Sequence, residues 1–457
     1  MSLVLIVLVL AGIAYYLGHR RSLRIAGGRI ADLHSLPGHY AWYAALLAAG
    51  PALALIVLWS IVSPLVLRWA TIGRLPADAQ ALSGPRLDFL MQDVARIAQG
   101  LPARGDVTPG LAQAGAFYGS LGTASTLLLW LLVLVLAVGG IYLALRWIAP
   151  DLRARNHVER VVRYLLLAAA VISILTTAGI VFSVLFESLR FFNRVPVTDF
   201  LFGLHWSPQT ALRADQVGSS GSFGAIPLFV GTLLISTIAM LVAGPIGLLS
   251  AMYLAEYASP GFRNVAKPLM EILAGIPTVV YGFFAALTVA PFLRDAGQAI
   301  GLDVASESAL AAGGVMGIMI IPFVSSLSDD ALTAVPAAMR DASLGLGATR
   351  AETIRQVIVP AALPGIIAGF LLAVSRAIGE TMIVVMAAGL TANLTVNPLA
   401  AVTTVTVQIV TLLVGDQEFD SAKTLAAFAL GLMLFVTTLI LNVVALYVMR
   451  KYREKYD

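Results

Sequence analysis

Nine long apolar stretches constrain the fold of this chain more than any other feature of its sequence. A helix needs about 20 apolar residues to cross the hydrocarbon core of a bilayer, and each stretch approaches or meets that length. Only 12% of the 457 residues are charged, against about 25% in soluble globular domains, so too few polar side chains exist to cover a water-soluble particle. The sequence therefore predicts an all-α protein with nine membrane spans, near residues 2–17, 41–67, 122–147, 163–188, 225–256, 270–293, 308–326, 361–389 and 426–449.

The first stretch, residues 2–17, is short enough to be interpreted in two ways. It could be the apolar core of a signal peptide, which is removed from the mature protein. However, no basic region precedes it and no clear small-residue cleavage site follows it. We therefore expect it to be retained as the first span.

Lysine and arginine residues alternate between the loops in a way that predicts the orientation. Short cytoplasmic loops carry an excess of these residues, whereas long segments cross the membrane largely regardless of charge. Nine spans with an external N-terminus and a cytoplasmic C-terminus put every arginine-rich short loop in the cytoplasm. These loops lie around residues 20–29, 153–163, 263–267, 340–355 and 450–455.

The chain divides at about residue 150 into two predicted regions. Residues 1–150 hold three spans and an external polar loop at about 70–119, in which Leu87 to Ile97 could form an amphipathic helix. Residues 151–457 hold six spans, several of them interrupted by proline beside glycine. These residues are common in membrane helices, but breaks persist in lipid only where other helices or a water-filled cavity satisfy the backbone, which favours a tightly packed bundle. The interruptions are Gly244-Pro245, Gly275-Ile276-Pro277 and Pro364-Gly365.

Several classes of chemistry are disfavoured by what the sequence lacks. It has no cysteine, its five histidines are scattered, and no HExxH motif or carboxylate cluster has metal-ligand spacing. No basic patch with interleaved aromatic residues is present, which makes nucleic acid an unexpected partner. We therefore expect no metal, no cofactor and no nucleic acid.

The run from Asp341 to Pro364, DASLGLGATRAETIRQVIVPAALP, carries the most specific motif of the sequence. It resembles the EAA loop of ABC importer permeases, with the internal glycine and the late proline in register. Four positions depart from that pattern while keeping size class or charge, namely Asp341, Ser343, Val357 and Val359. The resemblance predicts a cytoplasmic coupling loop at about residues 329–360, with coupling residues Asp341, Ala342, Ser343, Gly347 and Pro360.

The residue types of this loop suit contact with a separate ATPase subunit. Small side chains at Ala342 and Ser343 let a short helix lie close to a partner surface, and Gly347 can take the positive φ that reverses the chain. Pro360 suits the first turn of a helix that re-enters the membrane. A phosphate-cradling loop needs a Gly-Lys pair, which occurs nowhere in the chain, so we expect a transporter subunit rather than an enzyme. The alternative is an ordinary amphipathic loop.

Two charges lie well inside the apolar stretch at 361–389. Arg376 and Glu380 are four residues apart, which is expected to put both on one face of the helix, within reach of each other; Ser375 and Thr381 flank them. A charge near the bilayer centre costs about 2.5–3.5 kcal/mol on insertion scales. Because a guanidinium matches a tetrahedral oxyanion, Arg376 could meet an anion in a translocation path. The alternative is a self-neutralising pair that only fixes helix packing.

Further segments are similar to the PstC family of phosphate permease subunits, over about residues 155–457. In that family the arginine and glutamate of the RAIGET segment are implicated in phosphate passage, which implies this role for Arg376 and Glu380. Thr232 and Ser236 are additional candidates for the path, although small hydroxyls also mediate ordinary packing of membrane helices. The segments that carry the similarity are Arg376–Thr381, Phe223–Pro227 with Gly231-Thr232, Trp206-Ser207-Pro208 and Ile276–Gly282.

The resemblance implies a type I importer fold with a MetI-like core of six helices, to which residues 1–150 are an N-terminal extension. It implies a bacterial inner-membrane complex with a PstA-like second permease, two PstB-like ATPase subunits and a periplasmic PstS-like phosphate-binding protein. Three alternatives remain open at this point. The chain could be the paired PstA-type subunit, it could carry sulfate or molybdate, or it could be a secondary transporter or channel.

Overall fold

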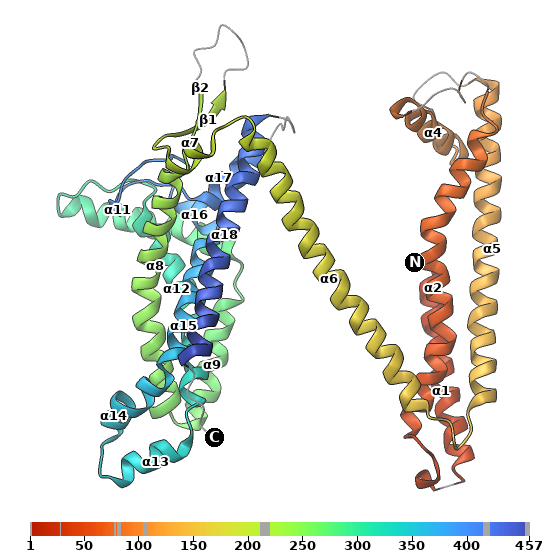
Figure 1. The fold of residues 1–457 in the computed structure, drawn as a ribbon, viewed down its shortest axis with the longest axis horizontal. Coiled ribbons are helices and arrows are strands. Elements are labelled where there is room, and N and C mark those ends of the chain that lie inside the picture. The colour runs from red at the N-terminus through yellow and green to blue at the C-terminus, as the bar shows by residue number, and fades with distance from the viewer. Residues whose placement is uncertain are drawn as a thin grey trace. The chain divides into compact units, whose positions relative to one another are not determined.

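A computed structural model describes residues 2–27, 29–76, 79, 84–103, 108–210, 220–414 and 421–452. Parts of the loop predicted at 70–119, and the basic residues Arg453 and Lys455, lie outside the described residues. The chain forms two compact units, Met1–Leu175 and Thr176–Asp457. Each is built from long helices (Figure 1).

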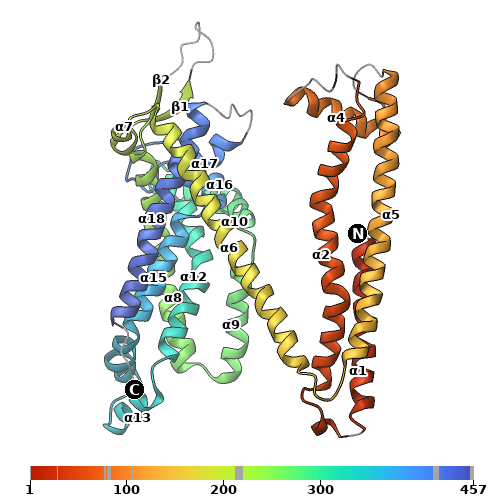
Figure 2. The ribbon, with the colours of Figure 1, turned by 45° about the vertical axis from the view of Figure 1, so that its right-hand side comes forward.

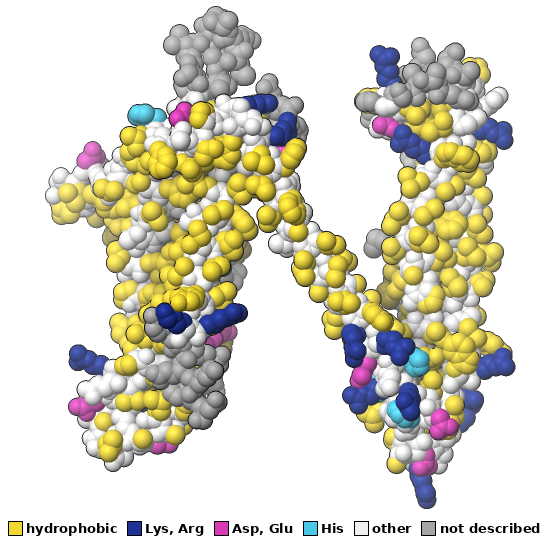
Figure 3. All heavy atoms as spheres, in the orientation of Figure 1, with side chains coloured by type: hydrophobic (Ala, Val, Ile, Leu, Met, Phe, Trp, Pro, Cys, Tyr) yellow, Lys and Arg dark blue, Asp and Glu magenta, His cyan; other side chains and the backbone are white. Residues whose placement is uncertain are grey.

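Nine helices of the described residues are long and apolar enough to cross a membrane. They coincide with the nine predicted stretches, which confirms the predicted number and approximate positions of the spans. Within each unit, apolar side chains lie along the helices, whereas many arginine and lysine side chains lie near the helix ends (Figure 3). This distribution is the one that a hydrocarbon solvent favours, because charged groups then remain at the polar interfaces.

The first unit is built on three packed helices, α1 (Ser2–Ile25), α2 (Pro37–Ile72) and α5 (Pro109–Trp147). Helix α1 buries Val7 against residues of α2 and α5. The backbones of α2 and α5 approach so closely that a Cβ atom at Gly140 would clash with the carbonyl oxygen of Leu47. Small residues permit this kind of close packing between membrane helices.

Two smaller features complete the first unit. The amphipathic helix expected near residues 87–97 is confirmed as α4 (Pro85–Ala98), which packs on α5. At the other end, a 3-10 turn (Ile30–Asp32) leads into α2, and the Tyr40 hydroxyl donates to the carbonyls of Pro150 and Leu152. These bonds attach the start of α2 to the turn before α6 (Ala154–Phe192), a helix that contributes to both units.

Beyond α6, the second unit forms a small cap. Helix α7 (Val197–Phe202) is followed by an antiparallel hairpin of β1 (Trp206–Thr210) and β2 (Ser220–Phe223), in which Trp206 pairs with Phe223. This hairpin is an exception to the expected all-α architecture. Its aromatic side chains pack edge-to-face with one another and with Phe191.

Four long helices form the bundle of the second unit (Figure 2). They are α8 (Ile226–Met252), α12 (Ala309–Thr333), α15 (Val359–Ile378) and α18 (Ala422–Tyr452). Helices α8 and α12 are in the closest contact, because glycines of α12 face α8: a Cβ atom at Gly317 would lie 2.8 Å from Val242. The core of this unit surrounds α12, with Met316 and Ile320 fully buried.

Two of the predicted spans are not single helices. The span predicted at 270–293 consists of the end of α9 (Pro260–Ala274) and then α10 (Thr278–Phe284), a π-helical turn (Ala285–Val289) and α11 (Ala290–Ala299). The Gly275-Ile276-Pro277 sequence separates α9 from α10, because proline at 277 removes a backbone donor and disfavours a helical residue before it.

The span predicted at 361–389 also contains a break. Helix α15 ends at Ile378 and α16 (Met382–Ala387) begins after Gly379, Glu380 and Thr381. A further short helix, α17 (Val405–Leu413), lies before α18 and is largely buried. The coupling segment contains α13 (Ala337–Gly345), α14 (Arg350–Thr353) and a π-helical turn (Ile354–Ile358).

Candidate translocation path and coupling site

Arg376 lies in the last turn of α15, directly before the helix break. Its side chain is exposed in this chain, and its guanidinium carbon lies 5.8 Å from the ring centroid of Phe323 on α12. Among the described residues no carboxylate is paired with it. The guanidinium group of Arg376 is therefore accessible to an anion at the surface of the bundle.

Glu380 lies beyond the end of α15, so the expectation that Arg376 and Glu380 share one helical face is wrong. Its Oε1 accepts a hydrogen bond of 3.1 Å from the backbone N–H of Met382, the first residue of α16. The physical reason is the break itself, since the carboxylate satisfies an amide that a new helix start leaves without an intrahelical partner. The self-neutralising pair that was the alternative is absent from the described ion pairs.

The buried start of α17 holds the segment of Glu380 in place. The Thr406 hydroxyl donates to the backbone carbonyl of Glu380 over 2.8 Å. Thr404 caps α17 by accepting from the N–H of Val407. These two threonines also lie 2.9 Å apart, oxygen to oxygen, so the helix break and α17 form one hydrogen-bonded structure.

Thr232 joins this structure from α8, whereas Ser236, Ser375 and Thr381 do not. Its hydroxyl donates to the carbonyl of Leu228 and accepts from the N–H of Val405. Ser236 is buried one turn further along α8, Ser375 is half-buried on α15, and the Thr381 hydroxyl contacts the carbonyl of Gly379 at 3.5 Å. The structure thus places Thr232 and the backbone of Glu380 around the start of α17.

Gln408 and Trp206 extend the same structure to the hairpin, and sequence reasoning assigned neither a role. The Gln408 amide donates to the carbonyl of Leu390 and to the hydroxyl of Thr403, while its Oε1 accepts from the Trp206 indole N–H. A signal existed, because threonines and a glutamine recur in an otherwise apolar run at 402–414. Such polar side chains need buried partners, but their spacing does not identify those partners.

The coupling loop has the turn expected from its sequence. Gly347 has φ +89 between α13 and α14, which confirms the predicted positive φ. Thr349 and Glu352 form a reciprocal capping box at the start of α14, and the hydroxyls of Ser343 and Thr353 lie 2.9 Å apart. These contacts fix the two short helices against each other.

The outer surface of α13 is open to a partner. Asp341 and Ala342 are exposed, and Leu346 at the tip is 90% exposed. Pro360 lies in the first turn of α15 as expected, although α15 continues from α14 through the π-helical turn instead of starting anew. Because Pro360 has no backbone N–H, one backbone hydrogen-bond donor is missing from the helix that runs from α14 into α15.

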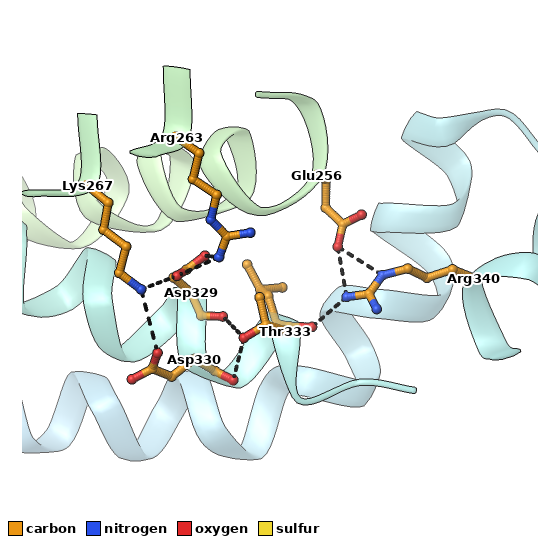
Figure 4. Close-up of polar contacts among 8 residues, drawn as sticks. Glu256, Arg263, Lys267, Asp329, Asp330, Thr333 and Arg340 are labelled. Carbon is orange, nitrogen blue, oxygen red and sulfur yellow. Dashed lines mark hydrogen bonds and ion pairs between the residues drawn. The ribbon is translucent and has the colours of Figure 1, made fainter. Parts of the chain in front are cut away.

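A cluster of charges lies where α12 meets the coupling segment (Figure 4). Arg263 donates to both carboxylate oxygens of Asp329, at 2.8 and 3.0 Å, and Lys267 donates to one of them at 2.7 Å. The hydrogen bond from Lys267 to Asp329 raises the pKa of the Lys267 ammonium above its ordinary value. Both cations come from α9 and the carboxylate from α12, so the cluster fastens these two helices together.

Two family models match the chain. Residues 243–454 match the family described as "Binding-protein-dependent transport system inner membrane component". Residues 4–176 match the family described as "Phosphate ATP-binding cassette transporter". The second match includes most of the first unit, for which sequence reasoning found no relative.

Curated proteins also match the chain, over more than half of its length. A probable ABC transporter permease, YqgH of Bacillus subtilis, is 33% identical over 60% of this chain and 85% of its own length. The phosphate transport system permease protein PstC of Mesorhizobium japonicum is 30% identical over 62% of this chain and 88% of its own length. The chain belongs to the PstC family of ABC transporter permeases. Members of this family are transporter subunits, and the multi-pass helical fold agrees with that.

Solved structures that match this chain include a bacterial ABC transporter involved in the import of the acidic polysaccharide alginate. The match covers 66% of this chain and 100% of that chain, at 16% identity and a TM-score of 0.45. The coupling loop and the Arg376–Thr381 break both lie inside residues 243–454, which match the binding-protein-dependent transport family.

Proposed function

We propose that this chain is the permease subunit of an ATP-driven importer of inorganic phosphate. The observation that carries the proposal is the position of Arg376, an unpaired guanidinium among the described residues, at a helix break in a membrane bundle. A guanidinium fork binds the oxygens of a tetrahedral anion in a bidentate manner. The printed names of relatives such as the Mesorhizobium PstC protein support phosphate as that anion.

Glu380 has two roles in this proposal. Through the N–H of Met382 it fixes the start of α16, six positions beyond Arg376. Its other carboxylate oxygen could accept a hydrogen bond from a protonated phosphate oxygen, which fully ionised sulfate does not offer. Discrimination against sulfate would follow, because sulfate would bring like charge to the carboxylate without a compensating hydrogen bond.

The coupling loop is proposed to bind an ATPase on another chain, because the sequence has no Gly-Lys pair for a phosphate-cradling loop. Asp341, Ala342 and Leu346 would face that subunit, while Ser343 would hold α13 against α14 through Thr353. The proposed complex contains a PstA-like permease, two PstB-like ATPase subunits and a PstS-like binding protein in a bacterial inner membrane. Its orientation would be that predicted from the loop charges, with a periplasmic N-terminus and a cytoplasmic C-terminus.

The N-terminal region is proposed to belong to the phosphate system as an extension of the permease. The match of residues 4–176 to a family described as a phosphate transporter supports this role. The domain boundary that we predict at residue 150 falls before α6, a single helix that runs from Ala154 to Phe192. In the proposal the region is retained in the membrane, including its first span.

Reconstitution in vesicles tests the proposal. The complete complex should take up phosphate in an ATP-dependent manner and should prefer phosphate to sulfate and molybdate. Arg376→Gln should abolish uptake while the complex still assembles, whereas Arg294→Gln, at an arginine of α11 whose side chain is 38% exposed, should leave uptake unchanged. Normal uptake by the Arg376 variant would remove that residue from the path, and transport by this chain alone would favour a secondary transporter or channel.

A further inference from the structure

Arg340, in the first turns of α13, contacts two other elements at once (Figure 4). Its Nη1 donates to the carbonyl of Val335 and its Nη2 to the carbonyl of Leu332, both at 2.8 Å. On its other side Nε and Nη2 lie 3.1 and 3.0 Å from Oε1 of Glu256. All the donor nitrogens of this guanidinium are therefore used within the permease itself.

The two carbonyls lie at and just beyond the C-terminal end of α12, which ends at Thr333. A cation is favourable there because the carbonyls at a helix C-terminus carry partial negative charge. Only three residues separate the end of α12 from the start of α13 at Ala337. By bridging this turn, Arg340 makes α12 and α13 a fixed corner instead of a flexible joint.

Glu256 belongs to the π-helical turn that ends α8 (Tyr253–Tyr257). The side chains of Glu256 and Arg340 are 14% and 23% exposed, so the pair is partly shielded from water. Ion pairs of this kind lose more when one partner is removed than exposed pairs do. Through this pair, α13 is attached to α8 as well as to α12, the two helices in closest contact in the bundle.

Asp329 extends the connection to a third helix. It lies on the same end of α12, its side chain is 4% exposed, and it binds Arg263 and Lys267 of α9. Helix α9 ends at the Gly275-Ile276-Pro277 break that precedes α10. A displacement of the end of α12 would thus be passed to α9 and to this break.

We propose that Arg340 is a positioning residue that transmits displacement of the coupling helix α13 to α8 and α12, and from α12 through Asp329 to α9. The proposal rests on the proposed function, because only coupling to an ATPase gives the displacement a source. In a rigid-body transition, an element that is fastened to two moving helices passes its displacement to both of them. Without Arg340, α13 would still meet the ATPase through its outer surface, but its movement would be lost in the turn at Ala334–Pro336.

The experiment measures coupling rather than uptake alone. Reconstituted complexes carrying Arg340→Gln, Arg340→Lys or Glu256→Gln are compared with the wild type for phosphate uptake, ATP hydrolysis and co-purification of the ATPase. Arg340→Gln should lower phosphate transported per ATP hydrolysed by at least about fivefold, the lower end of ordinary coupling between sites, with the ATPase still bound. Arg340→Lys should fall between it and the wild type, and Arg294→Gln should match the wild type.

Each remaining outcome decides against the proposal or moves the decision to a second variant. An unchanged ratio in assembled Arg340→Gln complex overturns it, as does a folded variant that no longer binds the ATPase, which would make Arg340 a docking residue. If Arg340→Gln yields no folded protein, Glu256→Gln decides, since it leaves the carbonyl bonds of Arg340 intact, and an unchanged ratio there overturns the proposal. A wild-type complex that moves no phosphate would instead refute the proposed function.

Discussion

The indole N–H of Trp206 donates to Oε1 of Gln408 over 2.9 Å, which joins two residues 202 positions apart in the sequence. Both side chains are buried. Gln408 lies in α17, whose start also binds the backbone carbonyl of Glu380 through Thr406. A single bond therefore connects the hairpin of the cap with the helix break that carries the candidate path residues.

Trp206→Phe should destabilise the chain although it keeps an aromatic ring against Phe223. The substitution removes the indole donor and leaves Oε1 of Gln408 buried without this partner, which costs about 1–3 kcal/mol. The measurement is the free energy of unfolding, or the thermal midpoint, of the purified chain in detergent. Trp69→Phe is the matched control, because Trp69 is 79% exposed. Equal stability of both variants would show that the Trp206 bond contributes nothing.

The positions of the spans could be predicted from the sequence because lipid imposes a simple requirement. A spanning helix must be long and apolar whatever it packs against, so hydropathy locates the nine spanning helices of the described part of the chain. The turn at Gly347 was equally accessible, since a positive φ is a local property of glycine. Both predictions depend only on the local sequence, within about one helix length of the position that is predicted.

The candidate site could be predicted only in part, because it depends on where a helix stops. The four-residue spacing of Arg376 and Glu380 implies a shared face only inside a continuous helix, and α15 ends between them at Ile378. The apolar sequence continues through the break, so composition gives no warning. The partners of Trp206 and Gln408 could not be predicted either, because a long-range hydrogen bond leaves no local pattern.

Asp329→Asn should loosen the attachment of α9 to α12. Loss of one partner from a buried ion pair costs about 3–5 kcal/mol, but Arg263 and Lys267 are 31% and 32% exposed, so we expect a loss of about 2 kcal/mol. Because the pKa of Lys267 is raised, its contribution is fully present at neutral pH and disappears only as the pH rises through that raised pKa. Thermal unfolding at neutral pH is the measurement.

The neighbouring residue supplies the control for Asp329. Asp330 is 67% exposed and lies 3.9 Å from Lys267, a geometry that contributes at most about 1 kcal/mol. Asp330→Asn should therefore leave the midpoint nearly unchanged. If the two variants unfolded at the same temperature, the buried cluster would not be what holds α9.

Gly231→Ala should disrupt the packing of α8 against the segment before α17. An added Cβ atom would clash with the backbone carbonyl oxygen of Thr403, which cannot move like the end of a flexible side chain. Overpacking of this kind costs about 1–3 kcal/mol. The thermal midpoint of the purified chain should fall, and phosphate uptake should fall with it because Thr232 and Val405 would separate.

Gly314→Ala is the counterpart for Gly231, since a Cβ atom at Gly314 in α12 would meet nothing within 4 Å. Its midpoint should be unchanged or slightly higher, because alanine is the better helix former. Tolerance of alanine at Gly231 to the same degree would contradict the close approach of α8 to Thr403.

Gly347→Ala should impair coupling through the backbone alone. The residue has φ +89, and a Cβ atom there would meet no atom within 4 Å, so any effect comes from conformational strain and not from a clash. A left-handed conformation costs an L-residue about 1–2 kcal/mol, enough to shift α13 relative to α14. We expect lower phosphate uptake per ATP hydrolysed, with asparagine milder than alanine because it tolerates this conformation better. Gly345→Ala, which adds a Cβ atom to the helical end of α13 and also meets no atom, should couple normally; if it impaired coupling as much as the change at Gly347, the reversed turn would not be the cause.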